Sequence, residues 1–155
     1  MIWLAALHAA CFAVAPFATL LGGHSFIAGA VPAGIGCAVT ATAVLRHGAG
    51  NASTMVLASA LARVVTTVAA WNRAALMLLL VGEAVMLLSQ LLLEIPVVSR
   101  LRGLLVWRYS VGTLVGAASA AMTVAAFAGV PVLASGGVQL GVALVAGPVL
   151  WRATA

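Results

Sequence analysis

The stretch from Asn51 to Leu93, NASTMVLASALARVVTTVAAWNRAALMLLLVGEAVMLLSQLLL, decides the fold. It holds two apolar lengths, residues 51–70 and 74–93, separated by the polar turn Trp71-Asn72-Arg73. A bilayer core of about 30 Å is crossed by roughly 20 helical residues, so each length can form one transmembrane helix. The stretch therefore predicts a helical hairpin inside a membrane.

The rest of the chain has the same apolar character. Hydrophobic residues make up 65% of the 155 residues, charged residues only 6%, and the mean hydropathy is +1.27. Soluble domains have about 25% charged residues. Too few polar side chains are present to cover a surface in water. We therefore expect an all-α integral membrane protein, a helical bundle forming one domain over residues 1–155.

The chain divides into six apolar lengths that can each cross a bilayer. They run over about residues 2–21, 26–45, 51–70, 74–93, 109–129 and 131–150. We expect the fourth to end at Glu94-Ile95-Pro96. Residues 96–109 are expected to form a charged loop or a short interfacial helix.

The arginines orient this bundle. With six spans, both termini and five arginines share one side: Arg46, Arg100, Arg102, Arg108 and Arg152. Arg73 falls on the other side, and Arg63 lies within the third span. By the positive-inside rule, both termini are expected in the cytoplasm. The absence of lysine and the alanine, glycine and arginine bias suggest a bacterial inner-membrane protein.

Arg63 and Glu83 are two charges placed at the same expected depth. Arg63 lies ten residues before Arg73, and Glu83 lies ten residues after it. At 1.5 Å per residue, both are about 15 Å from one membrane face. An isolated charge at that depth is costly, so we expect the two to pair across the hairpin.

Two interpretations of this pair remain open. It is either a structural staple between two helices or a proton or ion relay in which Glu83 titrates. Polar neighbours on the same helices could extend it as a stripe: Ser59, Thr66, Thr67 and Gln90. Asn72-Arg73, followed by apolar residues and Gly82-Glu83, locally resembles small membrane subunits of complex I-type and Mrp antiporter-type assemblies. Those subunits imply further buried acids, which are not found in spans five and six.

His8, Cys11 and Cys37 form a second candidate set. His8 and Cys11 are three residues apart on one helical face, and Cys37 is expected at the same depth as Cys11. A histidine and two thiols could hold copper or zinc, which would make the protein a metal or redox carrier. A closed site needs a fourth ligand, and buried cysteine more often packs as a small apolar residue. We expect neither a resident metal nor another cofactor.

Pro32, Gly34 and Gly36 are a third candidate, a break in the second helix. Proline removes one backbone hydrogen bond, and nearby glycines permit a local opening. Broken helices of this kind line substrate sites in transporters, whereas most transmembrane prolines only bend their helix.

The absence of catalytic motifs and the distribution of charge reduce the number of functions to consider. The chain lacks paired carboxylates, a G-x-S-x-G segment and an H-E-x-x-H segment, so we expect no enzyme. Its net charge of +5 comes from scattered arginines and scarce acids, so it does not indicate nucleic-acid binding. We expect an accessory or self-associating membrane protein, in contact with lipid and with other membrane subunits or a second copy. The alternative is a compact proton- or ion-coupled transporter that uses Arg63 and Glu83.

Overall fold

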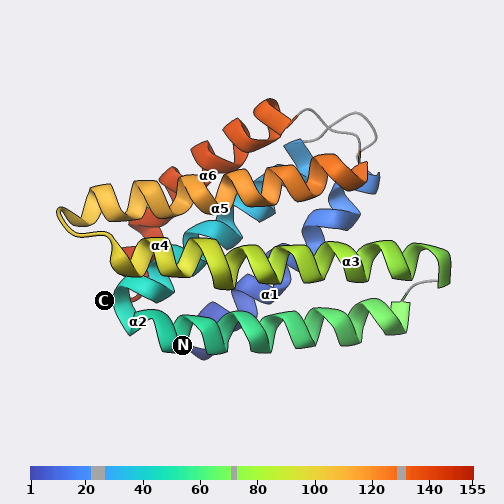
Figure 1. Ribbon diagram of the computed structural model, residues 1–155, viewed down its shortest axis with the longest axis horizontal. Coiled ribbons are helices and arrows are strands. Elements are labelled where there is room, and N and C mark those ends of the chain that lie inside the picture. The colour runs from blue at the N-terminus through green and yellow to red at the C-terminus, as the bar shows by residue number, and fades with distance from the viewer. Residues whose placement is uncertain (22–26, 71–72, 129–131) are drawn as a thin grey trace.

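The protein is built from helices. The computed structural model describes residues 1–21, 27–70, 73–128 and 132–155, and these residues contain no strand. The elements are α1 (Ile2–Leu21), α2 (Ile27–Ala70), α3 (Arg73–Ser89), the π-helix η1 (Gln90–Glu94), α4 (Ile95–Arg100), α5 (Leu105–Ala128) and α6 (Val132–Ala153). The expected all-α class is confirmed for this part of the chain. Figure 1 shows the helices lying side by side as an elongated bundle.

α2 consists of two helical arms that reverse at Gly48. Gly48 has φ 83° and ψ 163°, a conformation that is essentially restricted to glycine. The chain turns back there, so residues 27–47 (the first arm) and residues 49–70 (the second arm) run in opposite directions (Figure 1). The reversal falls between the apolar lengths 26–45 and 51–70.

The helix that follows runs further than expected. It does not end at Glu94-Ile95-Pro96 but continues through η1 and α4 to Arg100. Proline has no N–H and its ring collides with the carbonyl four residues earlier in a regular α-helix. The π-turn over Gln90–Glu94, immediately before Pro96, widens the helix at this point and lets it continue.

The expected surface segment at residues 96–109 is correspondingly short. Only residues 101–104 lie outside helices, and Gly103 turns the chain there with φ 109°. α5 begins at Leu105, so Arg108 and Tyr109 belong to a long helix and not to an interfacial element. Arg108 Nη2 donates a hydrogen bond to the Val98 carbonyl at 3.5 Å and so closes the turn.

The first arm of α2 is the packing centre of the bundle. α1 and α6 both pack against α2, and a row of small side chains four residues apart is buried along this arm: Ala30, Gly34, Ala38 and Thr42. A methyl group on Gly34 would lie 2.5 Å from the Gln139 carbonyl oxygen of α6. Small residues are needed at such positions because they let helix backbones approach closely.

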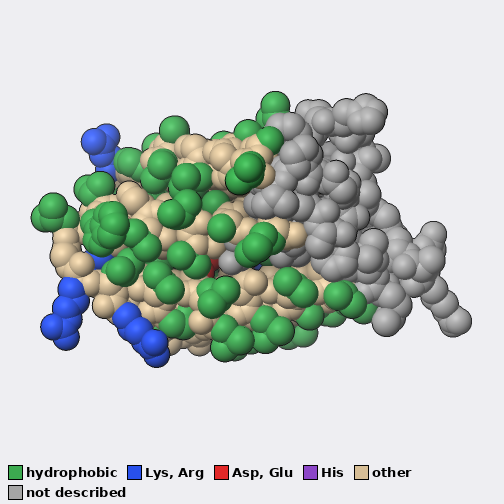
Figure 2. Space-filling model, turned by 45° about the horizontal axis from the view of Figure 1, so that its top comes forward, with side chains coloured by type: hydrophobic (Ala, Val, Ile, Leu, Met, Phe, Trp, Pro, Cys, Tyr) green, Lys and Arg blue, Asp and Glu red, His purple; other side chains and the backbone are tan. Residues whose placement is uncertain are grey.

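The outside of the bundle is apolar. Hydrophobic side chains cover the sides of the described helices in the face shown in Figure 2, and arginines gather at one end. Three helical stretches are long and apolar enough to cross a membrane, namely Ile27–Val65, Leu80–Arg100 and Leu133–Ala153. The described residues thus have the character of a membrane-associated protein.

Candidate site: a buried polar network

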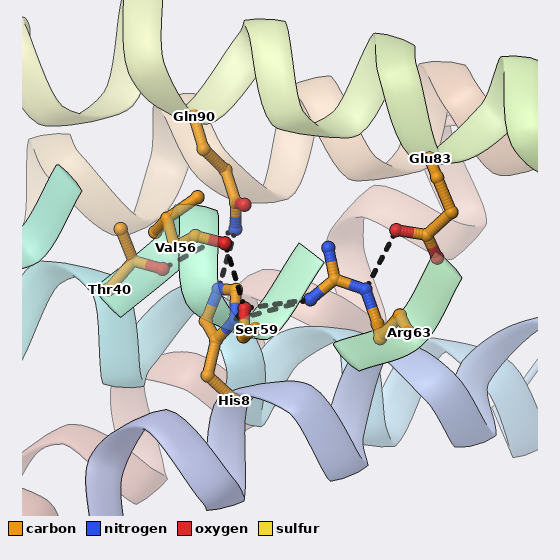
Figure 3. Close-up of polar contacts among 7 residues, drawn as sticks. All are labelled: His8, Thr40, Val56, Ser59, Arg63, Glu83 and Gln90. Carbon is orange, nitrogen blue, oxygen red and sulfur yellow. Dashed lines mark hydrogen bonds and ion pairs between the residues drawn. The ribbon is translucent and has the colours of Figure 1, made fainter. Parts of the chain in front are cut away.

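An ion pair joins the second arm of α2 to α3. Arg63 Nε donates to Glu83 Oε2 at 2.7 Å, and Arg63 is only 2% exposed (Figure 3). The two residues are equally distant in sequence from Arg73, at which α3 begins. Antiparallel helices with a short connection bring such residues to the same level.

Ser59 connects this pair to α1. Arg63 Nη1 donates to Ser59 Oγ at 2.9 Å, and His8 Nδ1 lies 2.6 Å from the same oxygen. Ser59 Oγ in turn donates to the Val56 carbonyl at 3.0 Å. His8 and Ser59 are both buried, so α1 is attached to the second arm through a polar contact inside an apolar core.

Gln90 completes the network from the opposite side. Its Nε2 lies 2.9 Å from His8 Nε2 and 3.4 Å from Thr40 Oγ1 (Figure 3). An amide nitrogen can only donate, so His8 Nε2 accepts and the imidazole proton lies on Nδ1, where it faces Ser59. We call these six residues the polar network: His8, Thr40, Ser59, Arg63, Glu83 and Gln90.

The polar network holds several helices together at one place. It draws on α1, both arms of α2, α3 and η1. Phe12 covers one side of it, with its ring centroid 4.8 Å from that of His8 and 5.5 Å from Arg63 Cζ. A neutral imidazole, a hydroxyl and an ionised pair in such a core can hold helices in register, and they can also hold or pass a proton.

Two of the four polar side chains predicted near the ion pair can be placed in the structure. Thr66 and Thr67 lie within α2, but their side chains are outside the described residues. Ser59 and Gln90 are both in the polar network. The structure thus brings together Arg63, Glu83, Ser59 and Gln90, and it adds His8 and Thr40.

The histidine and the two cysteines are not assembled into one site. His8 makes its polar contacts to Ser59 and Gln90, whereas Cys37 packs in an apolar cluster with Phe12, and Cys11 is a buried free thiol. Among the described residues, no three His, Cys, Asp or Glu side chains are grouped as metal ligands. Of the candidate set His8, Cys11 and Cys37, the structure thus places the histidine in the polar network.

The candidate helix break at Pro32, Gly34 and Gly36 is not found in α2. Gly48 is the only residue of α2 with non-helical dihedral angles, and Pro32 lies within a continuous helix. Gly34 packs against the α6 backbone, and a methyl group on Gly36 would overlap the Phe12 ring. The two glycines serve close packing, so no opening forms around them.

Glu94 is the buried acid that sequence reasoning placed incorrectly at a helix end. It lies in η1, is 1% exposed, and neither carboxyl oxygen has a hydrogen-bond partner among the described residues. No local signal distinguishes it from an acid at a helix end, because Pro96, two residues later, predicts that the helix stops there.

Comparison with known proteins adds no assignment. No protein-family model, no curated protein and no solved structure matches the chain.

A double-mutant cycle tests the energetic coupling of Arg63 to Glu83. Arg63→Gln or Glu83→Gln alone leaves a buried charge without its partner, so each should lower the free energy of unfolding by about 3–5 kcal/mol. The double variant should lose much less than the sum of the two. The measurement is a denaturant titration in detergent micelles followed by circular dichroism. Thr54→Val, on the exposed side of the same arm, is the control; additive losses would contradict the coupling.

Proposed function

We propose that the chain is a six-span membrane protein with both termini in the cytoplasm, and that it works as a compact proton-coupled carrier. The observation that carries the proposal is the polar network, which places an ion pair and a histidine inside a mainly apolar bundle. Ionisable residues at membrane depth are costly and mark proton or ion pathways in many membrane proteins.

Helix length supports the six spans. Six helical segments each contain 20 or more residues, a length that matches a bilayer core: α1, the two arms of α2, the continuous α3–η1–α4 helix, α5 and α6. Side chains on their outer faces are large and apolar, among them Leu61 at 67% exposure and Leu133 at 92%. Such side chains are stable against lipid and costly in water.

The arginines support the orientation. The reversal at Gly48, the turn at residues 101–104 and the C-terminus lie at one end of the bundle, and α3 begins at the other (Figure 1). Five of the seven arginines flank those three features. Arg46 is fixed there, since it donates to the Trp151 carbonyl at 2.8 Å and stacks 3.6 Å from the Trp151 ring centroid.

Proton coupling is favoured over a purely structural staple. A staple would need only Arg63 and Glu83, whose charges already compensate each other. The polar network continues from this pair through Ser59 and His8 to Gln90. Hydroxyl and imidazole groups can donate and accept protons, so this continuation adds proton-exchanging groups that a staple does not need.

The accessory or self-associating role is the second candidate, and α6 supports it. Gly137 and Gly141 are exposed, and a methyl group on either would meet no described atom within 4 Å. Small residues four apart on a lipid-facing helix allow close contact with a second membrane helix. Here the small-residue row of α6 faces outward, unlike the buried row of the first arm.

Topology can be tested with single introduced cysteines in intact cells. With the fourth span crossing the membrane, Asn72→Cys should react with a membrane-impermeant maleimide added outside, and Ser99→Cys should react only after permeabilisation. Ala153→Cys, at the C-terminal end, should behave like Ser99→Cys. The reverse pattern would contradict the orientation, and equal labelling of Asn72→Cys and Ser99→Cys would contradict the span between them.

Transport can be tested in proteoliposomes. With a potassium gradient and valinomycin, vesicles containing the protein should acidify faster than empty vesicles, as reported by an enclosed pH-sensitive dye. Glu83→Gln and Arg63→Gln should each slow this flux by about tenfold or more, the effect of about 1.4 kcal/mol on a barrier. The control variant Thr54→Val should retain the full proton flux. Equal flux with and without protein would contradict the carrier proposal.

Self-association can be tested on α6. Gly141→Ile should weaken a dimer formed in lipid by about tenfold or more, because a branched side chain prevents close backbone approach. Energy transfer between labelled copies at several protein-to-lipid ratios measures the effect. Ala118→Ile, on the exposed face of α5, is the matched control. A monomer at every ratio, or equal weakening by both substitutions, would contradict a specific α6 contact.

A further inference from the structure

Glu94 differs from Glu83 in having no compensating charge. These are the only two acidic side chains of the chain. Glu83 is joined to Arg63, whereas no ion pair involves Glu94 among the described residues. An isolated carboxylate in an apolar interior is far less stable than a paired one. The ionised form is therefore stabilised at Glu83 and destabilised at Glu94.

The surroundings of Glu94 are apolar or neutral. Its carboxyl group lies against α5, where a methyl group on Gly116 would be 2.7 Å from Glu94 Cδ and Oε1. The elements packed against η1 are α2, α3, α4 and α5. The titratable groups that face Glu94 from them are the Cys37 thiol of α2 and the Tyr109 hydroxyl of α5. The Tyr109 hydroxyl donates its proton to the Ala143 carbonyl at 3.3 Å, so it does not donate to Glu94.

The buried side-chain acceptor atoms of η1 are left without donors in the described part of the chain. Both of its carboxyl oxygens and Oε1 of Gln90 are buried without a hydrogen-bond partner among the described residues. Glu94 and Gln90 are the two buried residues of η1. A proton on Glu94 removes the uncompensated charge and turns one of its two unpartnered acceptor oxygens into a donor. It also needs no coordination space, which a metal ion would.

The π-turn explains why the two acids face different neighbours. A π-turn contains one residue more than an α-turn, so it rotates the following part of the helix about its axis. Glu83, before the turn, faces the second arm of α2 and meets Arg63 there. Glu94, at the end of the turn, faces Gly116 of α5. It is six residues from Arg100, or about 9 Å along the helix.

We propose that Glu94 is a proton-binding site buried in the bundle, reached from the arginine-rich end, and that Glu83 stays ionised against Arg63. Binding forms an O–H bond on one Glu94 oxygen with a proton from water at that end, and the carboxylate loses its charge. The inference deepens the proposed carrier function, because it names Glu94 as the acid that exchanges protons. It differs from the relay interpretation, in which Glu83 is the group that titrates.

Dicyclohexylcarbodiimide tests this proposal on the full-length protein in lipid nanodiscs. This apolar reagent adds a protonated carboxyl across its C=N bond and leaves a stable acylurea on the side chain. Peptide mapping by mass spectrometry should locate the label on Glu94 near neutral pH, with Glu83 unmodified. Labelling should decline as pH rises, because the protonated fraction falls about tenfold per pH unit once most carboxyls are ionised.

The two acids provide matched controls. Glu83→Gln should retain the label and Glu94→Gln should lose it. If Glu94→Gln does not fold, the position of the label in the unaltered protein decides alone. A label on Glu83, or on neither acid, overturns the proposal. Protection of Glu94 by sodium ions at constant pH overturns it as well, since sodium would then be the ligand.

The outcome is separable from that of the carrier proposal. Labelling reports proton binding at Glu94 and does not require transport. A pH-dependent label on Glu94 together with no proton flux in proteoliposomes would therefore sustain the binding site and contradict the carrier.

Discussion

A hydrogen-bonding group in hydrocarbon has no water to bond, so it must find its partner within the protein. In this chain that constraint bears most on the polar network, where Arg63 donates to Glu83 and Ser59, and His8 is hydrogen-bonded to Ser59 and Gln90. Each contact joins a different pair of helical segments except that between Arg63 and Ser59. The helices are therefore held in register by polar groups, while their apolar side chains also cover the outside of the bundle.

Close backbone packing makes the network possible. Short polar side chains such as Ser59 and Thr40 can reach a neighbouring helix only where the helices approach closely. Small residues along the first arm of α2 permit this approach, and Gly36 lies directly against the Phe12 ring of α1. Gly48 contributes differently, since its dihedral angles let two arms of one chain lie antiparallel without a long loop. The positions of the small residues thus determine both the close packing of the helices and the hydrogen bonds between them.

Some residues of the polar network can be predicted from the sequence, and others cannot. Arg63 and Glu83 could be matched by counting residues from Arg73, because depth in a hairpin is a linear function of position. Ser59 and Gln90 followed as near neighbours on the same helices. His8 was assigned to the thiols, because its partners lie 51 and 82 residues away and no local pattern reports such contacts. The sequence predicts a helix end at Glu94 because Pro96 usually ends a helix, and local propensity does not reveal the π-turn that lets the helix continue.

By itself, the sequence determined that the described part of the protein is helical and apolar, and it placed one reversal near Gly48, between two apolar lengths. Composition and the spacing of polar turns are properties of the chain, and bilayer thickness converts them into helix lengths. Tertiary structure alone decided that His8 joins the charge pair, that Gly137 and Gly141 face outward, and that Glu94 is buried without a counter-charge. These outcomes depend on the rotation of each helix about its axis. That rotation is set by contacts between helices, which no single helix encodes.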